Sequence, residues 1–144
     1  MNFRQEGGCL CGAVRYELTE PPTHTGYCHC RMCRRATGAP VFAGASFRRS
    51  GFRLTQGEPK RHRSSERAFR HFCAECGSPL FFEPLDAPEF LEVLVGSLDD
   101  ASWVEMQRHS FAASRIPWFD VRDDLPRSPG WPDPERHKDK PQGY

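Results

Sequence analysis

The sequence has no long hydrophobic run. No stretch of its 144 residues approaches the ~20 consecutive apolar residues that a membrane span requires. Residues 1–6 also lack the apolar core of a secretory signal. We therefore expect a cytoplasmic protein with no membrane partner.

The sequence also lacks three common catalytic fingerprints: a Ser-His-Asp order, a Walker loop and a dinucleotide-binding glycine motif. The formal net charge of +1 is too small to suggest nucleic-acid binding, so no nucleic-acid partner is expected. Positive charge is nevertheless clustered, at Arg31-Arg34-Arg35, Arg48-Arg49 and Lys60-Arg61-His62-Arg63. A solvated surface explains such clusters more simply than an anion site does.

Cysteine, in contrast, is abundant, with seven residues. Thiols stay reduced in a cytoplasm, and an odd number cannot pair fully, so the pattern favours metal binding over disulfides. The cysteines form three clusters, Cys9-x-Cys11, Cys28-x-Cys30-x-x-Cys33 and Cys73-x-x-Cys76. A Cys-x-x-Cys turn followed by a glycine lets two thiolates bind one tetrahedral ion.

Seven ligands divide most simply into four and three. Cys9, Cys11, Cys73 and Cys76 (the four-cysteine cluster) can fill a tetrahedral zinc site, and Cys28, Cys30 and Cys33 (the three-cysteine cluster) leave one position vacant on a second Zn²⁺. Closing the roughly 60 residues between Cys11 and Cys73 costs about 3–4 kcal/mol. A structural zinc site is worth roughly 10–16 kcal/mol, so the metal outweighs the cost of closure.

The vacant position suits a fourth thiolate. Metal binding removes the proton of a thiol, and three thiolate ligands make zinc a weak activator of water, so hydrolysis is disfavoured. Arg31 lies within the cluster and Arg34 and Arg35 follow it directly, so these arginines could hold carboxylates of the incoming molecule. A small thiol with carboxylates, such as glutathione, fits these needs.

The remaining pattern predicts a small antiparallel β architecture. Short strands are expected at 14–18, 41–43, 52–54, 68–72, 80–82 and 90–95, and helical turns at 31–37, closed by Gly38, and at 99–103. Residues 1–127 are expected to form one zinc-binding β domain. Residues 128–144 are rich in proline and charge, and we expect them to form a flexible tail.

Other candidate residues have simpler explanations. His29 and His71 could be a fourth ligand or a proton shuttle, but histidines in such positions are more often supporting or exposed. Trp118, beside a proline, is expected in the core. Asp99-Asp100 and Asp123-Asp124 are expected to cap turns or helix starts.

Several of these segments together resemble the glutathione-dependent formaldehyde-activating enzyme family, which includes a centromere-associated branch. They are Gly7–Tyr16, Cys28–Arg34, Gly38–Val41, Phe72–Leu80, Gly96–Asp99, His109–Phe111 and Ser114–Phe119. The resemblance implies a zinc-containing β-tent fold, with a structural zinc on the four-cysteine cluster and a catalytic zinc on Cys28, Cys30 and Cys33. It also implies a carbon–sulfur lyase that joins glutathione to formaldehyde as S-hydroxymethylglutathione.

Three alternative functions were weighed. Cys73-Ala74-Glu75 resembles half of a zinc-deaminase signature, but the required Pro-Cys-x-x-Cys does not follow it. A methionine sulfoxide reductase would need a redox cysteine after Cys76, and there is none. The remaining alternative is a non-catalytic, zinc-stabilised binding module with Arg-rich contact loops. The sequence leaves open the true aldehyde and thiol, and whether the protein is a homo-oligomer.

Overall fold

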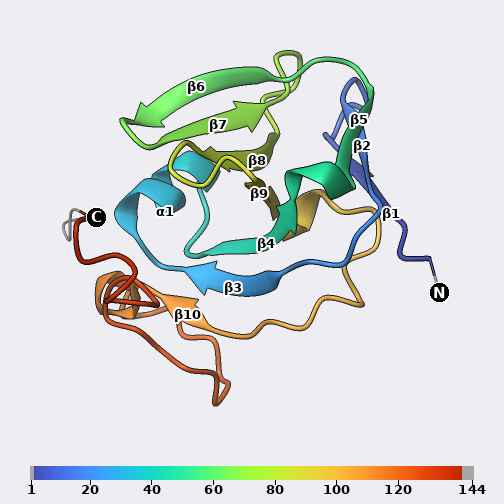
Figure 1. Ribbon diagram of the computed structural model, residues 1–144. Helices are drawn as coiled ribbons and strands as arrows, with labels where there is room; N and C mark the ends of the chain where they lie inside the picture. The colour runs from blue at the N-terminus through green and yellow to red at the C-terminus, as the bar shows by residue number, and fades with distance from the viewer. Residues whose placement is uncertain (1, 141–144) are drawn as a thin grey trace. The chain divides into compact units, whose positions relative to one another are not determined.

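The computed structural model describes residues 2–140 (Figure 1). Met1 and residues 141–144, which include the end of the expected tail, lie outside the described residues. The strands are β1 (Gln5–Gly8), β2 (Arg15–Leu18), β3 (His24–Cys28), β4 (Phe42–Arg48), β5 (Phe52–Gln56), β6 (Lys60–Ser65), β7 (Ala68–Phe72), β8 (Pro79–Pro84), β9 (Phe90–Leu94) and β10 (His109–Ser110). The helical segments are α1 (Arg31–Thr37) and the short 3-10 turns η1 (Arg49–Gly51), η2 (Val95–Ser97) and η3 (Ala112–Ser114). The expected mainly β, antiparallel fold with short helical segments is confirmed.

The chain forms two compact units, each built from two separate segments. The first unit comprises residues 2–24 and 45–104, and the second comprises residues 25–44 and 105–140. Each unit contains one of the two cysteine clusters. The single domain expected over residues 1–127 and the boundary at 127 stay predictions.

Two sets of antiparallel strands build the first unit. β1, β2 and β5 form a three-stranded sheet, and β6, β7, β8 and β9 pair in sequence order (Figure 1). Gly7 in β1 permits a close approach, because a Cβ there would lie 2.3 Å from the Tyr16 hydroxyl oxygen. The buried core consists of Cys9, Val14, Tyr16, Leu18, Ala45, Phe47, Cys73, Leu80, Phe81, Leu91, Val93 and Leu98. Cys9 and Cys73 of the four-cysteine cluster are thus part of this core.

The second unit is organised around a parallel pair of strands, β3 and β10. Helix α1 follows β3, and its bounds are those expected from the sequence. Cys30 caps its first turn by accepting a hydrogen bond from the Cys33 backbone N–H, and Gly38 ends it with φ of 65°. The buried polar side chains here include two histidines, His29 and His109, each with no exposed surface. The centre of this unit is therefore more polar than that of the first.

Two local expectations were wrong. Residues 99–103 form no helix, and the helical turn in that region is η2, which precedes them. Trp118 is 76% exposed instead of lying in the core.

The segment expected to be a tail makes contacts within the second unit. The backbone N–H groups of Phe111 and Ala112 donate to the carbonyls of Gly130 and Ser128, at 2.9 and 2.8 Å. The Trp131 ring packs edge-on against Phe111, with the centroids 5.1 Å apart. Composition alone did not reveal these contacts. Residues 128–131 therefore pack on the segment that begins at Phe111.

Within residues 2–140, no helix combines the length and the apolar character that a membrane crossing needs.

Candidate metal centres

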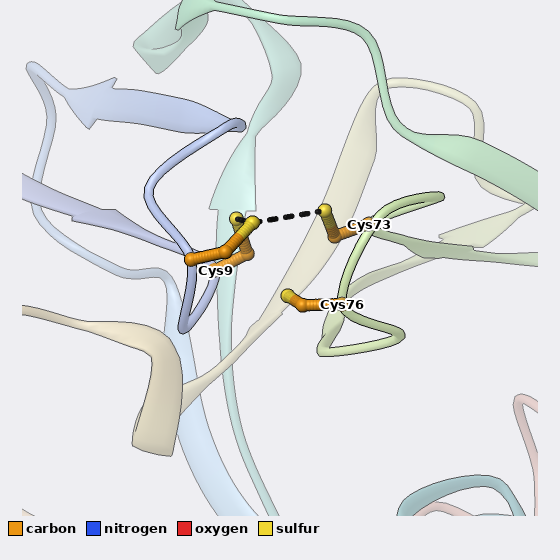
Figure 2. A group of neighbouring side chains, drawn as sticks. Cys9, Cys73 and Cys76 are labelled. Carbon is orange, nitrogen blue, oxygen red and sulfur yellow. Dashed lines mark hydrogen bonds between the residues drawn. The ribbon is translucent and has the colours of Figure 1, made fainter.

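The four-cysteine cluster joins two loops of the first unit. Cys9 and Cys11 follow β1, and Cys73 and Cys76 follow β7 (Figure 2). The four sulfur atoms all lie within 4.8 Å of one another. The cluster therefore has the ligands and the proximity of a single metal site.

Backbone turns aim these sulfurs inward. The Gly12 N–H donates to the Cys9 carbonyl and the Gly77 N–H to the Cys73 carbonyl, at 3.2 and 2.9 Å. Both glycines have positive φ, 79° and 75°, which side-chain-bearing residues rarely adopt. The glycines thus permit each pair of cysteines to curl around one point.

Ser78 links the two loops. Its hydroxyl oxygen accepts from the Leu10 N–H at 3.1 Å and lies 3.1 Å from the Cys76 sulfur. Its carbonyl accepts from the Cys73 N–H at 3.0 Å. No local pattern marks this serine as important, because its role depends on a contact across 68 residues.

The sulfur spacing fits a tetrahedral ion. Bonds of about 2.3 Å from zinc to sulfur would separate the sulfurs at the corners of a tetrahedron by about 3.8 Å. Cys9 and Cys11 sulfurs are 3.6 Å apart, and Cys11 and Cys73 sulfurs are 3.8 Å apart. All seven cysteines are free, so these contacts are not disulfides. This cluster could hold a metal ion.

The thiols of the four-cysteine cluster influence one another's pKa. Hydrogen bonds from the side chain and backbone of Ser78 lower the pKa of Cys76 to about 5. The Ala13 N–H lowers the pKa of Cys11, but the thiols of Cys76 and Cys9 outweigh this and raise it to about 12. Several thiolates crowded together repel one another, and a bound cation would remove that repulsion.

The three-cysteine cluster lies in the second unit at the junction of β3 and α1. Its three sulfurs lie within 4.8 Å of one another. Cys28 ends β3, Cys30 caps α1 and Cys33 lies in the first turn of that helix. Cys30 is buried, whereas Cys28 and Cys33 are partly exposed. The thiols of Cys30 and Cys33 raise the pKa of the neighbouring Cys28 well above the usual value for a thiol. This cluster too could hold a metal ion, with three protein ligands.

Neither histidine that the sequence suggested as a fourth ligand joins either group of ligand atoms. His71 instead lies 2.6 Å from a Glu83 carboxylate oxygen and stacks on Phe81. His29 is fully buried, and its Nε2 lies 2.8 Å from His109 Nδ1. The fourth position of the three-cysteine cluster therefore has no histidine ligand within the described residues.

The arginines near the three-cysteine cluster differ in their surroundings. Arg31 and Arg35 are exposed, whereas Arg34 is partly buried. The Arg34 Nε is buried and has no hydrogen-bond partner among residues 2–140. Sequence reasoning could not separate the three.

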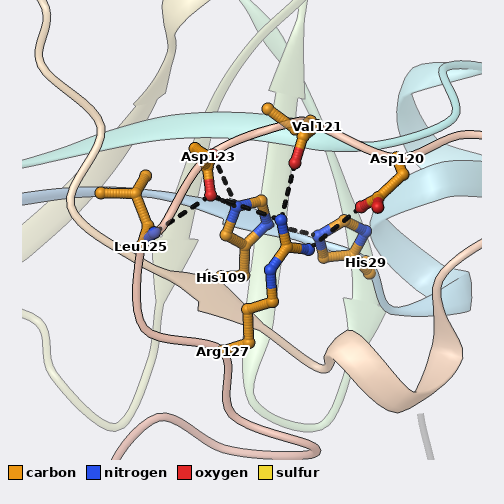
Figure 3. Close-up of polar contacts among 7 residues, drawn as sticks. All are labelled: His29, His109, Asp120, Val121, Asp123, Leu125 and Arg127. Atoms are coloured by element: carbon orange, nitrogen blue, oxygen red, sulfur yellow. Dashed lines mark hydrogen bonds and ion pairs between the residues drawn. The ribbon is translucent and has the colours of Figure 1, made fainter.

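The residues that surround the two buried histidines could not be recognised from the sequence. His109 Nε2 lies 3.0 and 3.1 Å from the two carboxylate oxygens of Asp123 (Figure 3). Asp123 also accepts hydrogen bonds from the Leu125 N–H and from Arg127. Asp123 was expected to cap a turn, and its bond to Leu125 N–H does so, but nothing in its spacing pointed to His109.

Sequence comparison relates this chain to known proteins. A protein of Halomonas elongata, provisionally named a glutathione-dependent formaldehyde-activating enzyme, is 26% identical in an alignment of length 127 that covers 81% of this chain and 80% of that protein. A Schizosaccharomyces pombe protein described as an uncharacterized lyase is 31% identical over 54% of this chain and 56% of its own length.

One solved structure supports the fold. A Rhodobacter sphaeroides protein determined by a structural genomics programme matches with a TM-score of 0.52 and 25% identity, over 85% of this chain and 99% of that one. The sequence model of the glutathione-dependent formaldehyde-activating enzyme family matches residues 4–114, which include all seven cysteines. The chain belongs to the glutathione-dependent formaldehyde-activating enzyme family.

Proposed function

We propose that this protein is a zinc-dependent carbon–sulfur lyase that makes and cleaves adducts of glutathione with a small aldehyde, of the S-hydroxymethylglutathione kind. The carrying observation is that seven cysteines form two separate groups of four and three ligand atoms. Four ligands complete a tetrahedral site, and three leave one position for a substrate. Family membership and the lyase-named relative support the same class of reaction.

The division of roles follows from the ligand count. We assign Zn²⁺ to both clusters because thiolates favour soft metals and tetrahedral sulfur sites favour zinc. The four-cysteine cluster would be structural, and Cys28, Cys30 and Cys33 would form the catalytic site. Zinc bound there would keep the sulfur of an incoming thiol deprotonated and available to an aldehyde carbon.

The chemical balance of the reaction is simple. A carbon–sulfur bond forms between the thiol sulfur and the carbonyl carbon, and the thiol proton ends on the carbonyl oxygen. Cleavage reverses both changes.

A cytoplasmic location, where glutathione is an abundant thiol, belongs to this proposal.

Turnover should depend on the three-cysteine cluster. NMR exchange spectroscopy measures how fast formaldehyde exchanges between its free form and its glutathione adduct. This exchange should be faster with the protein than without it. In Cys30→Ser the rate should fall to the spontaneous rate, because one of three ligands is lost. Ala36→Ser, at an exposed position on the same helix, is the control and should retain the activity. Full activity in Cys30→Ser would count against the proposal.

Arg34 is the arginine best suited to hold a carboxylate of glutathione. It follows Cys33 directly, and its buried Nε lacks a partner within the described chain. A guanidinium group binds a carboxylate through charge-assisted hydrogen bonds that are stronger than neutral ones.

The arginines can therefore be ranked by binding measurements. Arg34→Met should weaken glutathione binding about tenfold, equal to about 1.4 kcal/mol. Arg31→Met and Arg35→Met should have smaller effects, because exposed charges are screened by solvent and salt. Isothermal titration calorimetry measures all three. Equal effects would show that burial of Arg34 does not matter to the ligand.

One observation favours the non-catalytic alternative. Lys60, Arg61, His62 and Arg63 are all exposed on β6, which among residues 2–140 pairs only with β7. Such a basic strand could contact an acidic partner. Charges on an edge strand also have a structural explanation, because they prevent unwanted strand pairing. We therefore rank the binding module second, and the turnover experiment separates the two.

A further inference from the structure

A largely buried chain of hydrogen bonds, partly exposed only at Asp123, ends beside the three-cysteine cluster. It runs from Asp123 through His109 to His29 (the histidine–carboxylate chain; Figure 3). The two imidazole rings have no exposed surface and stack with centroids 5.1 Å apart. Asp123, the carboxylate of this hydrogen-bonded chain, lies beyond residue 114, where the match to the family model ends.

The pattern of donors and acceptors follows from the carboxylate. Burial alone would raise the pKa of Asp123, but hydrogen bonds from His109 and the Leu125 N–H lower it, so this group is an acceptor. His109 Nε2 therefore carries the proton that Asp123 accepts. In a neutral ring this leaves His109 Nδ1 as an acceptor, so His29 Nε2 donates to it. The carboxylate thus sets the tautomer of both rings.

His29 is fixed by its backbone as well as by its ring. Its N–H donates to the Ser110 carbonyl at 3.0 Å, and the Tyr27 N–H donates to the Arg108 carbonyl at 2.9 Å. His29 stands between Cys28 and Cys30, and alternate residues of an extended segment point to opposite sides. The absence of His29 from the group of three sulfurs agrees with that geometry. The His29 ring is therefore not among the grouped ligand atoms, and its hydrogen bonds hold the segment that carries two of the ligands.

The far end of the chain is also well held. The His109 N–H donates to the Pro126 carbonyl at 2.8 Å, and the Ser128 N–H donates to the His109 carbonyl at 3.0 Å. Arg127 contacts Asp123 and donates to the Val121 carbonyl at 2.6 Å. Residues 121–128 therefore hold His109 by its backbone and by its ring.

We propose that Asp123 and His109 are positioning residues for the three-cysteine site, which hold His29 and thereby the placement of Cys28 and Cys30. The inference rests on the proposed zinc at that site. Groups that orient metal ligands commonly change metal affinity about 10- to 100-fold when removed. Removing a member of the histidine–carboxylate chain should lower the metal affinity of the three-cysteine site by a similar factor. It should not change the metal affinity of the four-cysteine cluster.

The test compares two neighbouring acids. Asp123→Ala removes the acceptor of His109, and Asp124→Ala removes an exposed acid one residue away. Zinc affinity is measured for each site by competition with a chelator, and the ligand geometry is followed by the visible spectrum of the cobalt-substituted protein. In Asp123→Ala one of the two metals should bind about 10- to 100-fold more weakly with a changed cobalt spectrum. Asp124→Ala should match the wild type.

A second pair of variants keeps the result interpretable if Asp123→Ala folds poorly. His29→Ala should weaken the same single metal, whereas His29→Gln can still donate to His109 Nδ1 and should restore part of the affinity. Unchanged affinity for both metals in Asp123→Ala would overturn the inference. Parallel loss of both metals and of the thermal transition would also overturn it, because the chain would then support the whole fold. A wild-type protein that binds only one metal would instead contradict the proposed function itself.

Discussion

Cys76→Ser should destabilise the protein by several kcal/mol, whereas Cys30→Ser should leave it folded with one metal fewer. The four-cysteine cluster ties the loop after β1 to the loop after β7, and Cys11 and Cys73 are 62 residues apart in sequence. Structural zinc sites contribute roughly 10–16 kcal/mol, so a lost ligand removes a large share of the folding free energy. Cys28, Cys30 and Cys33 instead lie within one short segment and close no long loop.

Urea unfolding followed by circular dichroism, together with metal analysis of each variant, measures this difference. Cys9 and Cys73 also belong to the apolar core, so their replacement would mix a packing loss with the loss of metal. Cys76 lies outside that buried set and is the cleaner choice. The division into four and three ligands is contradicted if Cys76→Ser and Cys30→Ser lose the same stability.

Local chemistry made part of the fold predictable. The bounds of α1 follow from a capping residue before it and Gly38 after it, and β7 coincides with the strand expected at 68–72. The division of the cysteines agrees with the two groups found, because ligand spacing reflects the geometry of a tetrahedral ion. These features depend on residues close together or on a motif with a strong chemical preference.

Other features depend on distant contacts that no local pattern encodes. β6 is highly charged and was not expected as a strand. It forms because its backbone pairs with β7, and backbone hydrogen bonds do not depend on an apolar side-chain pattern. The contact between His29 and His109 spans 80 residues, and His109 and Asp123 meet only because the loop between them folds back. A sequence shows that such residues are present, but it cannot show that they touch.

Glutathione binding tests the central claim, that the three-cysteine site accepts a thiolate as its fourth ligand. Calorimetry in buffers of different ionisation enthalpy measures the proton release, and S-methylglutathione is the matched control because it keeps both carboxylates but cannot supply a thiolate. A free thiol near a pKa of ~8.5 is mostly protonated at neutral pH and must arrive deprotonated, so we expect glutathione to release about one proton per site, or fewer if it displaces hydroxide. S-methylglutathione should bind far more weakly. Equal affinity of the two ligands, without proton release, would show that the sulfur does not reach the metal and would favour the binding-module alternative.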